Sequence, residues 1–372
     1  MVSAAVILYV LFGYPLVLAL AARRPKPVRK QAQLQSVTVL MAVRNGEPWI
    51  RAKLESILSL DYPRDLLQTV VISDGSRDRT EELVREYETR GVELVRIPAR
   101  GKAAALNAGL ERARGDVLFY TDVRQQLAPD SLKHLVACLA DPEVGAASGE
   151  LVIRDGQTLE EIHTGLYWKY EKWIRRHESR IDSVMGATGC IFALRRRLAA
   201  RMPEGTLLDD VHLPMLAFFR GYRVILDEQA KAFDIPSSLN TEFRRKVRTQ
   251  AGVYQLLMQF PALLGPKNRM WFHFVSHKLG RLVLPHALIL LAASSFFLPQ
   301  PEKTWALAGQ AVFYALAAAD LLLPGCLLRR ITSPVRTFVV LMAAAFCAQA
   351  VWFVPAGRLW GDARKPPEAD QE

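Results

Sequence analysis

Hydrophobic and polar positions divide the chain into apolar ends and a mixed middle. Residues 4–22 contain no charged side chain, and this run is long enough to cross the roughly 30 Å hydrocarbon layer of a bilayer. Basic residues follow the run, in RRPKPVRK at residues 23–30, whereas a cleaved signal peptide carries its charges in front. We therefore expect residues 1–22 to form an uncleaved N-terminal membrane helix.

Three further apolar runs lie near the other end of the chain, at residues 282–298, 305–328 and 335–355. Their length and near absence of charge favour membrane-spanning helices over buried helices of a soluble domain. We expect three spans within residues 281–356, followed by a polar tail at residues 357–372. Asp320, in the middle run, either faces a polar path through the bundle or reaches the interface near the break at Pro324 and Gly325.

The positions of basic residues predict how these helices are oriented across the membrane. Basic side chains gather in residues 23–30 and 329–336, and short loops rich in arginine and lysine face the cytoplasm. This places the N-terminus outside and residues 23–280 in the cytoplasm. Residues 243–280 begin with a basic cluster ahead of an apolar stretch, which predicts amphipathic helices lying in the interface. The expected protein is integral to the inner or plasma membrane, with a cytoplasmic domain over residues 23–242.

Short apolar runs alternate with helical patterns in the middle of the chain. Strands are expected at residues 37–43, 68–74, 92–98, 116–122 and 144–153, and helices at 49–60, 79–90, 102–114 and 130–139. Nearly continuous apolar strands in this order predict a mostly parallel, Rossmann-like sheet covered on both faces. The expected fold class is thus α/β, with α-helical transmembrane segments added, and its ligands should bind beyond the carboxyl ends of the strands.

Charged side chains stand at those strand ends. Asp74 ends the second strand, Lys102 opens the helix after the third, and Asp122 ends the fourth. Asp74 alone fits an ordinary Asp-Gly turn, and Lys102 alone fits a solvated lysine, although a lysine at a helix N-terminus also suits a diphosphate. Asp122 points more strongly to function, because a carboxylate ending a buried strand costs stability unless it is paired or metal-bound.

Motifs and charge exclude several classes. No GxGxxG follows the first strand and no P-loop motif occurs, which disfavours a dinucleotide site and a P-loop nucleotide site. The net charge is +11 with a pI of about 9.6, yet no nucleic-acid motif accompanies it. Anionic lipids and a phosphorylated substrate are the partners that this charge predicts. The four cysteines lack zinc spacing, and we interpret them as small apolar residues in a reducing compartment.

Seven short segments follow one another along the chain in this order: RNGEPWI, VISDGSRDRT, RGKAAALNAGL, VLFYTDVRQQL, GATGCIFALRR, LLDDVHL and RRKVRT. Over residues 36–250 this order resembles the inverting family 2 glycosyltransferases, in particular the membrane-embedded synthases of cellulose, hyaluronan and poly-N-acetylglucosamine type. The resemblance implies a GT-A fold and an enzyme that uses a nucleoside diphosphate sugar, usually linked to UDP.

The resemblance also assigns roles at the donor site. It implies that Val43, Arg44, Glu47 and Asp74 bind the nucleoside, with the Asp74 carboxylate accepting from the uracil ring, and that Lys102 approaches the diphosphate. Asp122 matches the first aspartate of the family's DxD element, which contacts ribose and phosphates through Mg²⁺ or Mn²⁺. Asp122 is therefore the expected metal ligand.

On the acceptor side, the resemblance implies that Gly186, Thr188 and Gly189 line the acceptor pocket. Asp209 and Asp210 match the family's Glu-Asp pair, and Asp210 aligns with the catalytic base. Inverting transfer needs this arrangement, because one carboxylate takes the acceptor proton while positive groups stabilise the leaving diphosphate. An N-cap of the following helix is the alternative role for Asp210, and one carboxylate can serve in both.

Two positions depart from the family pattern. Arg124 replaces the second aspartate of DxD, which changes the local charge by about two units. Either Asp122 alone still binds a water-rich metal ion while Arg124 assists a phosphate, or Arg124 replaces much of the metal's electrostatic effect. A magnesium site needs only one or two protein carboxylates, which favours the first alternative. Thr249 stands where processive synthases carry tryptophan, which argues against long-chain processivity.

Arg245 and Arg248 match the family's (Q/R)xxRW element, and the resemblance implies that their guanidinium groups bind the diphosphate. A basic helix on anionic lipid is the alternative, and the two roles are compatible. The predicted function is membrane-bound inverting transfer from a UDP-sugar to a glycan or lipid-linked acceptor, as in polysaccharide synthesis, with a homo-oligomer possible. The alternatives are single-sugar transfer to a polyprenyl or glycerolipid acceptor and a catalytically silent subunit.

Overall fold

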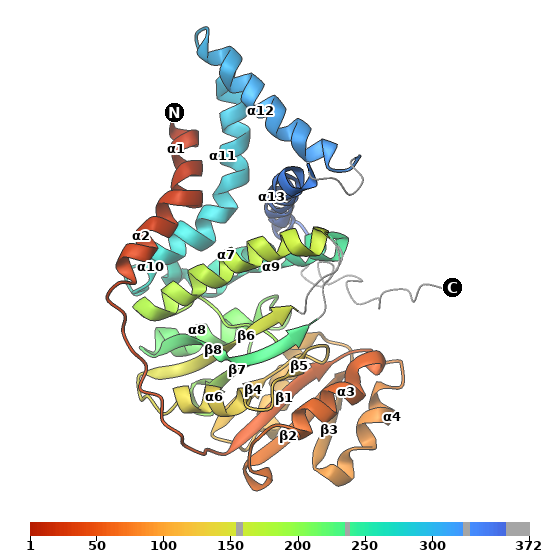
Figure 1. The fold of residues 1–372 in the computed structure, drawn as a ribbon. Helices are drawn as coiled ribbons and strands as arrows, with labels where there is room; N and C mark the ends of the chain where they lie inside the picture. The colour runs from red at the N-terminus through yellow and green to blue at the C-terminus, as the bar shows by residue number, and fades with distance from the viewer. Residues whose placement is uncertain (154–158, 235–238, 323–327, 355–372) are drawn as a thin grey trace. The chain divides into compact units, whose positions relative to one another are not determined.

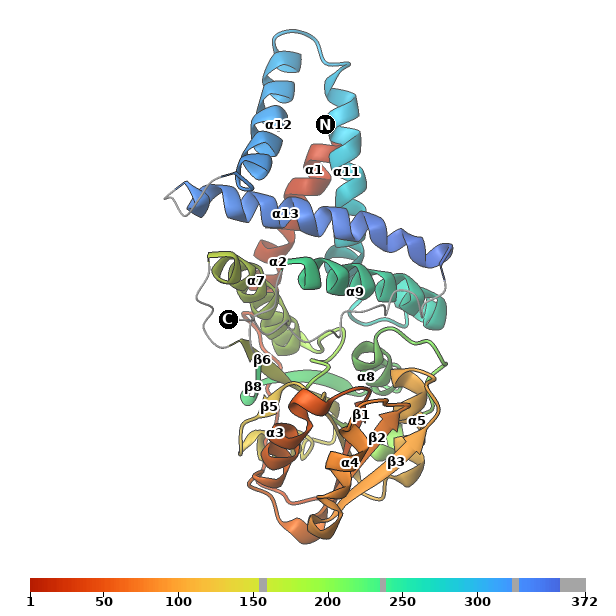
Figure 2. The ribbon, with the colours of Figure 1, turned by 90° about the vertical axis from the view of Figure 1, so that its right-hand side faces the viewer.

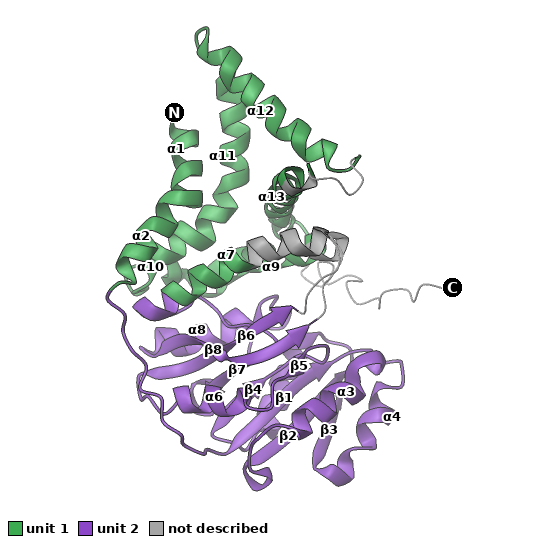
Figure 3. Ribbon diagram, in the orientation of Figure 1, with its two compact units in different colours: residues 1–23, 155–177, 236–363 green, residues 24–154, 178–235, 364–372 purple. Residues whose placement is uncertain are grey.

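The computed structural model describes residues 1–153, 159–234, 239–322 and 328–354 (Figure 1). They fall into two compact units (Figure 3). A helical unit takes in residues 1–23, 155–177 and 236–363, and an α/β unit takes in residues 24–154 and 178–235. The first part of the helix at residues 159–181 thus clusters with the helical unit, although it lies within the range expected for the cytoplasmic domain. The predicted tail at residues 357–372 lies outside the described residues.

The α/β unit is built on a sheet. Among the described residues, eight strands pair in the order β3-β2-β1-β4-β7-β6-β8-β5. They are β1 (Val37–Val43), β2 (Leu67–Asp74), β3 (Val92–Ile97), β4 (Val117–Tyr120), β5 (Gln126–Leu127), β6 (Val144–Ile153), β7 (Phe192–Arg195) and β8 (Arg223–Asp234). The predicted α/β fold class is confirmed.

Helices cover both faces of this sheet. They are α3 (Glu47–Leu58), α4 (Thr80–Arg85), α5 (Lys102–Arg112), α6 (Ser131–Cys138) and α8 (Asp209–Phe219), with short 3₁₀ turns at Arg64–Leu66, Glu88–Arg90 and Arg196–Leu198. Side chains alternate along β1, so Val39 and Met41 join the core cluster with Leu54 of α3. Leu40 faces the other way, toward Gly109 of α5. The opposite placement of α3 and α5 can be followed in Figure 2.

The first half of the sheet is parallel, as predicted, because β1 pairs in parallel with both β2 and β4, and β2 with β3. The second half is mixed. The strand β7 lies between β4 and β6 and is antiparallel to both, while β6 and β8 are parallel. The sequence pattern did not indicate β7, since its four residues form too short an apolar run to stand out from the loops around it.

The helical unit contains the apolar ends of the chain. Its helices are α1 (Val2–Leu8), α2 (Tyr14–Ala21), α7 (Leu159–Ile181, its first part), α9 (Leu239–Gln259), α10 (Trp271–His273), α11 (Gly280–Ser295), α12 (Glu302–Ala319) and α13 (Arg329–Cys347). π-helical segments at Tyr9–Gly13 and Phe274–Leu279 join α1 to α2 and α10 to α11, and 3₁₀ turns lie at Pro261–Leu264 and Ala348–Trp352. The π-helical turn in the first helix ends at Gly13, two residues before Pro15, whose missing N–H interrupts the regular hydrogen-bond ladder.

Three helices in the described part of the chain are long and apolar enough to cross a membrane: Val2–Ala21, Trp271–Ser295 and Ile331–Trp352. They correspond to three of the four predicted spans, and the second begins at Trp271 rather than at residue 282. The remaining prediction, residues 305–328, coincides in part with α12, which is not among the three. Figure 2 shows α1 beside α11, whereas α13 runs across them.

Asp320 lies buried where α12 ends. Its Oδ1 accepts hydrogen bonds from the hydroxyls of Thr332 (2.7 Å) and Ser333 (2.8 Å), and its Oδ2 pairs with Arg336 (3.2 Å). All three partners belong to α13. The carboxylate therefore ties these two helices together.

Candidate active site

Three charged side chains meet at the carboxyl ends of the first strands. The Nζ of Lys102 lies 2.8 Å from Oδ1 of Asp122 and 2.9 Å from Oδ2 of Asp209, as ion pairs. Burial works to lower the pKa of Lys102, but the two carboxylates outweigh it and raise that pKa above its ordinary value. Lys102 therefore stays a cation, and it joins two segments that lie far apart in the sequence.

Asp74 shapes the turn that presents Lys102. Its buried carboxylate accepts hydrogen bonds from the backbone N–H groups of Arg100 (2.7 Å) and Gly101 (3.0 Å). Gly101 has a φ of +95°, a conformation that favours glycine, and α5 begins at the next residue. Asp74 thus fixes the start of α5. Its predicted contact with the nucleobase stays a prediction.

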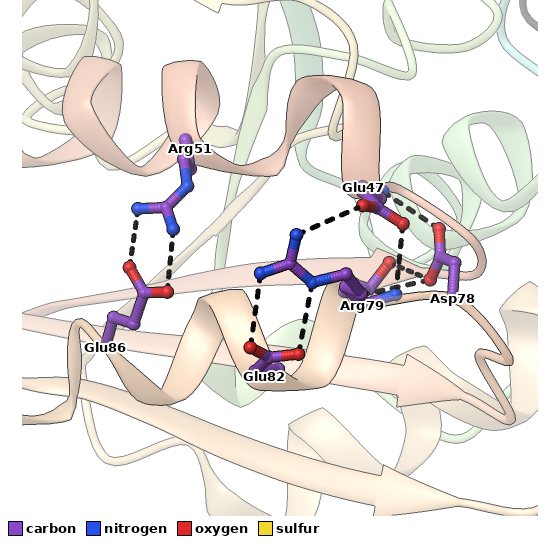
Figure 4. A network of polar contacts seen from close by, with 7 residues as sticks. Glu47, Arg51, Asp78, Arg79, Glu82 and Glu86 are labelled. Atoms are coloured by element: carbon purple, nitrogen blue, oxygen red, sulfur yellow. Dashed lines mark hydrogen bonds and ion pairs between the residues drawn. The ribbon is translucent and has the colours of Figure 1, made fainter.

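The loops after β1 and β2 are tied to each other (Figure 4). The side chain of Asp78 accepts from the N–H of Glu47 (3.0 Å), and the Glu47 carboxylate accepts from the N–H of Arg79 (3.2 Å). The guanidinium of Arg79 also pairs with Glu82 at 3.2 Å. Val43, buried at the end of β1, leads into this region through Arg44. These contacts fix the loops from which the predicted nucleoside ligands project.

Asp209 and Asp210 begin α8. Asp209 is buried and forms an ion pair with Lys102, whereas Asp210 is partly exposed. The backbone N–H of Ala187 donates to the Asp210 carbonyl at 2.7 Å. A Cβ on Gly189 would lie 3.0 Å from Oδ2 of Asp210, so only glycine leaves this carboxylate uncrowded. The predicted base and the predicted acceptor segment are therefore neighbours.

The acceptor segment has a demanding backbone. Gly186 has a φ of +125°, and a Cβ there would approach Val211 to 2.8 Å. The N–H of Thr188 donates to the Ser148 hydroxyl at 2.8 Å, and that hydroxyl lies 3.1 Å from the Thr188 hydroxyl. Glycine at position 186 is required both by conformation and by space.

Arg124 pairs with a different carboxylate from the two that Lys102 contacts. Its guanidinium pairs with Asp234 at the end of β8, at 2.6 Å, and the side-chain amide of Gln125 donates to the same carboxylate oxygen at 2.7 Å. Asp234 is buried, and the sequence analysis missed it. Its only signal is a carboxylate at the end of an apolar strand. Assistance to a phosphate by Arg124 stays a prediction.

Lys53 is a second residue that the sequence analysis missed. It is 1% exposed, and its Nζ donates to Oγ1 of Thr121 (2.6 Å) and to the carbonyl of Gln125 (2.5 Å). Burial lowers its pKa to about 8, and nearby Cys190 and Asp122 oppose that shift. The available signal was a lysine at an apolar position of α3, in the stripe of Ile50, Leu54 and Ile57.

The arginines of the predicted (Q/R)xxRW element lie in the helical unit. Arg245 and Arg248 are on α9, and the Thr249 hydroxyl donates to the Arg245 carbonyl at 2.8 Å. Their contact with a diphosphate stays a prediction. The helix α9 lies within the segment predicted to be amphipathic, and its placement in the membrane interface stays a prediction.

The donor set for a metal ion is small. In the described part of the chain, no three His, Cys, Asp or Glu side chains gather at one point. Asp122 has 37% of its side chain exposed and uses one oxygen on Lys102. Mg²⁺ sites on substrate phosphates need only one or two protein carboxylates. The residues therefore fit a metal that the donor's phosphates complete, and not a preformed cage.

Comparisons with known proteins agree with this geometry. The model of glycosyl transferase family 2 matches residues 38–202, and that of glycosyl transferase family group 2 matches residues 124–355. The chain is 26% identical to the probable glycosyltransferase YdaM of Bacillus subtilis (strain 168) over 64% of its own length and 60% of the relative's. It is 28% identical to an N-acetylglucosaminyltransferase of Rhizobium meliloti (strain 1021) over 69% and 65%. The match thus spans about three fifths of these relatives.

A solved structure matches nearly the whole chain. The mannosyltransferase PcManGT from Pyrobaculum calidifontis, in complex with GDP-Man and Mn²⁺, is 27% identical, with a TM-score of 0.71. The match covers 94% of this chain and 96% of that one. These findings confirm the resemblance and the GT-A fold inferred from the motifs.

Proposed function

The chain belongs to the family 2 glycosyltransferases, and we propose that it transfers a sugar, with inversion, from a nucleoside diphosphate sugar to a glycan or lipid-linked acceptor. The observation that carries this proposal is the position of Lys102 between Asp122 and Asp209, with Asp210 one residue further along. A fixed cation suits the leaving diphosphate, and a partly exposed carboxylate beside it suits an acceptor hydroxyl.

In the proposed reaction, Asp210 takes the proton of the acceptor hydroxyl as its oxygen attacks the anomeric carbon. The bond from that carbon to the diphosphate breaks on the opposite face, and Lys102 stabilises the charge that develops there. A bound Mg²⁺ or Mn²⁺ ion would be held by Asp122 and would neutralise phosphate charge. Asp209 keeps Lys102 in place, and the glycine at 189 leaves room beside the base.

We propose UDP as the donor nucleoside, on the family resemblance of the sequence motifs. The whole-chain structural match was determined with GDP-mannose, so GDP-sugars belong in any test of donor choice. The proposed setting is the cytoplasmic side of the inner or plasma membrane. The three apolar helices support membrane insertion, and the basic runs at residues 23–30 and 329–336 support the cytoplasmic side.

The second candidate function is the transfer of a single sugar to a lipid-linked acceptor. Thr249 stands where processive synthases carry tryptophan, and the chain matches a mannosyltransferase along 96% of that protein but the curated relatives along about three fifths. The missing tryptophan argues against long-chain polymerisation, which leaves addition of one sugar to a lipid-linked acceptor as the alternative.

Asp210→Asn tests the proposal. The amide keeps the shape of the side chain but accepts no proton, so we expect nucleotide binding to persist and transfer to fall about 10²- to 10⁴-fold. Purified membranes are incubated with a panel of UDP- and GDP-sugars, and the products are analysed by mass spectrometry. Ladder products indicate polymerisation, and one-sugar lipid adducts indicate the second candidate.

Asp130→Asn is the matched control, because Asp130 also stands at a helix N-terminus of the α/β unit, before α6. It should transfer sugar like the wild type. Near-normal turnover by Asp210→Asn would remove Asp210 from the mechanism. Binding of nucleotide without transfer to any acceptor by the wild type would favour the silent subunit instead.

A further inference from the structure

The loop that joins β4 to β5, residues 121–125, carries both Asp122 and Arg124. It is anchored at several points. Asp122 pairs with Lys102, and Arg124 and Gln125 both bind Asp234. The position of the Asp122 carboxylate, on which metal and donor binding depend in the proposed function, is therefore set by the anchors of this loop.

Lys53 supplies an anchor of a different kind. A single ammonium group donates to Thr121 at the start of the loop and to the carbonyl of Gln125 at its end. It thereby bridges the two ends across the three residues between them. Thr121 is fixed further by its own hydroxyl, which donates to the Cys190 carbonyl at 2.8 Å.

A lysine at position 53 lowers stability if its only role is to pack against apolar side chains. It is fully buried on the apolar face of α3, and the described part of the chain gives it no ion pair within 4.0 Å. Burial of an ammonium group that lacks a carboxylate partner costs stability. Methionine would fill similar space at this position without that cost.

We propose that Lys53 is a positioning residue of the nucleotide-sugar site. By bridging Thr121 and Gln125, it fixes the loop that presents Asp122 to the metal and the donor phosphates. This inference rests on the proposed function. It assigns to α3, a helix on one face of the sheet, an influence on donor binding that acts through the loop after β4.

The same helix provides a matched control. The hydroxyl of Ser56, one turn after Lys53, accepts from the N–H of Leu127 at 2.7 Å. It therefore tethers α3 to β5, just beyond the loop, without a charge, and its described hydrogen bonds do not reach residues 121–125. A purely structural tether should behave like Ser56.

The test compares full-length Lys53→Met and Ser56→Ala in detergent. UDP and GDP binding in the presence of Mn²⁺ is measured by calorimetry, together with Tm and the KM values for donor and acceptor. For Lys53→Met we expect binding to weaken and the donor KM to rise about 10- to 100-fold, with the acceptor KM within about twofold of wild type. Its Tm should be no lower than that of Ser56→Ala, which should bind nucleotide like the wild type.

Wild-type nucleotide binding by Lys53→Met overturns the proposal. So does an equal rise in both KM values accompanied by a lower Tm, because that marks a general structural role. If Lys53→Met does not fold, Thr121→Val removes one end of the bridge, and unchanged donor binding by it counts against the proposal in the same way.

The two proposals fail separately. A wild type that binds UDP or GDP but transfers no sugar refutes the proposed function, while the comparison of variants by binding still decides the role of Lys53. A wild type that binds neither nucleotide refutes both.

Discussion

At the scale of single residues, the role of a charged side chain depends on the group with which it pairs. Arg124 stands in a motif where the family carries a carboxylate, and the sequence invites a role on phosphate. In the structure it neutralises Asp234, a buried carboxylate 110 positions later in the chain. The local charge of the loop therefore rests on Asp122, Lys102 and Lys53. No spacing rule in the sequence links Arg124 to Asp234, since only the pairing of β5 with β8 brings them together.

The protonation of Lys53 gives a prediction on stability. Its pKa falls from 10.5 to about 8 on folding, so the folded state disfavours the proton. The resulting cost, about 3 kcal/mol, is fully present below pH 8. It disappears as the pH rises through 10.5, where the unfolded chain has also lost the proton.

We therefore expect the stability of the wild type relative to Lys53→Met to increase between pH 8 and 10.5. Thermal melts of both proteins at pH 7, 8, 9 and 10 measure this difference, in which the alkaline titration of other groups cancels. A difference in Tm that does not change over this range would show that folding leaves the pKa of Lys53 unchanged, because a lowered pKa makes the folded state bind fewer protons than the unfolded chain between pH 8 and 10.5.

The sequence revealed the residues at strand ends but not the residues beneath them. Asp74, Lys102, Asp122 and Asp210 were found because charges at the carboxyl ends of apolar runs and ordered motifs are local signals. Lys53 was missed because a lysine within a helix is usually solvated, and only the tertiary contact with the loop after β4 shows otherwise.

At the scale of elements, the hydrophobic pattern predicted the nearly continuous apolar strands of the parallel half of the sheet. The prediction for β1 matches the structure residue for residue, and α5 starts at the predicted Lys102. Three of the described strands were not predicted. The short strands β5 and β7 carry too little periodicity in two to four residues, and polar and charged side chains interrupt the apolar pattern of the longer β8. Antiparallel insertion of β7 depends on long-range pairing, which composition does not encode.

Asp320 provides an element-scale prediction for α12 and α13. Replacing it with alanine leaves Arg336 and two hydroxyls without their shared acceptor. Removal of one partner of a buried pair costs about 3–5 kcal/mol, so Asp320→Ala should lower the Tm of the detergent-solubilised protein by several degrees. Asp320→Asn keeps one acceptor oxygen and should lower it less.

Ser294→Ala serves as the control, because the Ser294 hydroxyl donates to a carbonyl of its own helix and is exposed. Its Tm should equal that of the wild type. Equal melting of Asp320→Ala and wild type would show that the pairing contributes nothing to helix association.

At the scale of the whole molecule, the distribution of carboxylates determines how ligands stabilise the protein. The described residues offer Asp122 as a metal ligand but no cluster of three acidic or imidazole side chains. A divalent ion should therefore bind weakly alone and tightly with a nucleoside diphosphate, whose phosphates complete its coordination. A ligand that binds only the folded state raises stability by RT ln(1 + L/Kd), where L is its free concentration, so an ion that binds weakly by itself adds little.

We therefore expect Mn²⁺ and UDP together to raise the Tm of the full-length protein by more than the sum of their separate effects. Mn²⁺ alone should leave Tm within about 1 °C of the free protein, whereas Mn²⁺ with saturating UDP should raise it by about 5 °C or more. UDP with excess EDTA should give less than half of that shift, and Asp122→Asn should lose the part that depends on Mn²⁺. If UDP in EDTA reproduces the full shift, the diphosphate binds without a metal, and the metal-bound alternative for Asp122 is wrong.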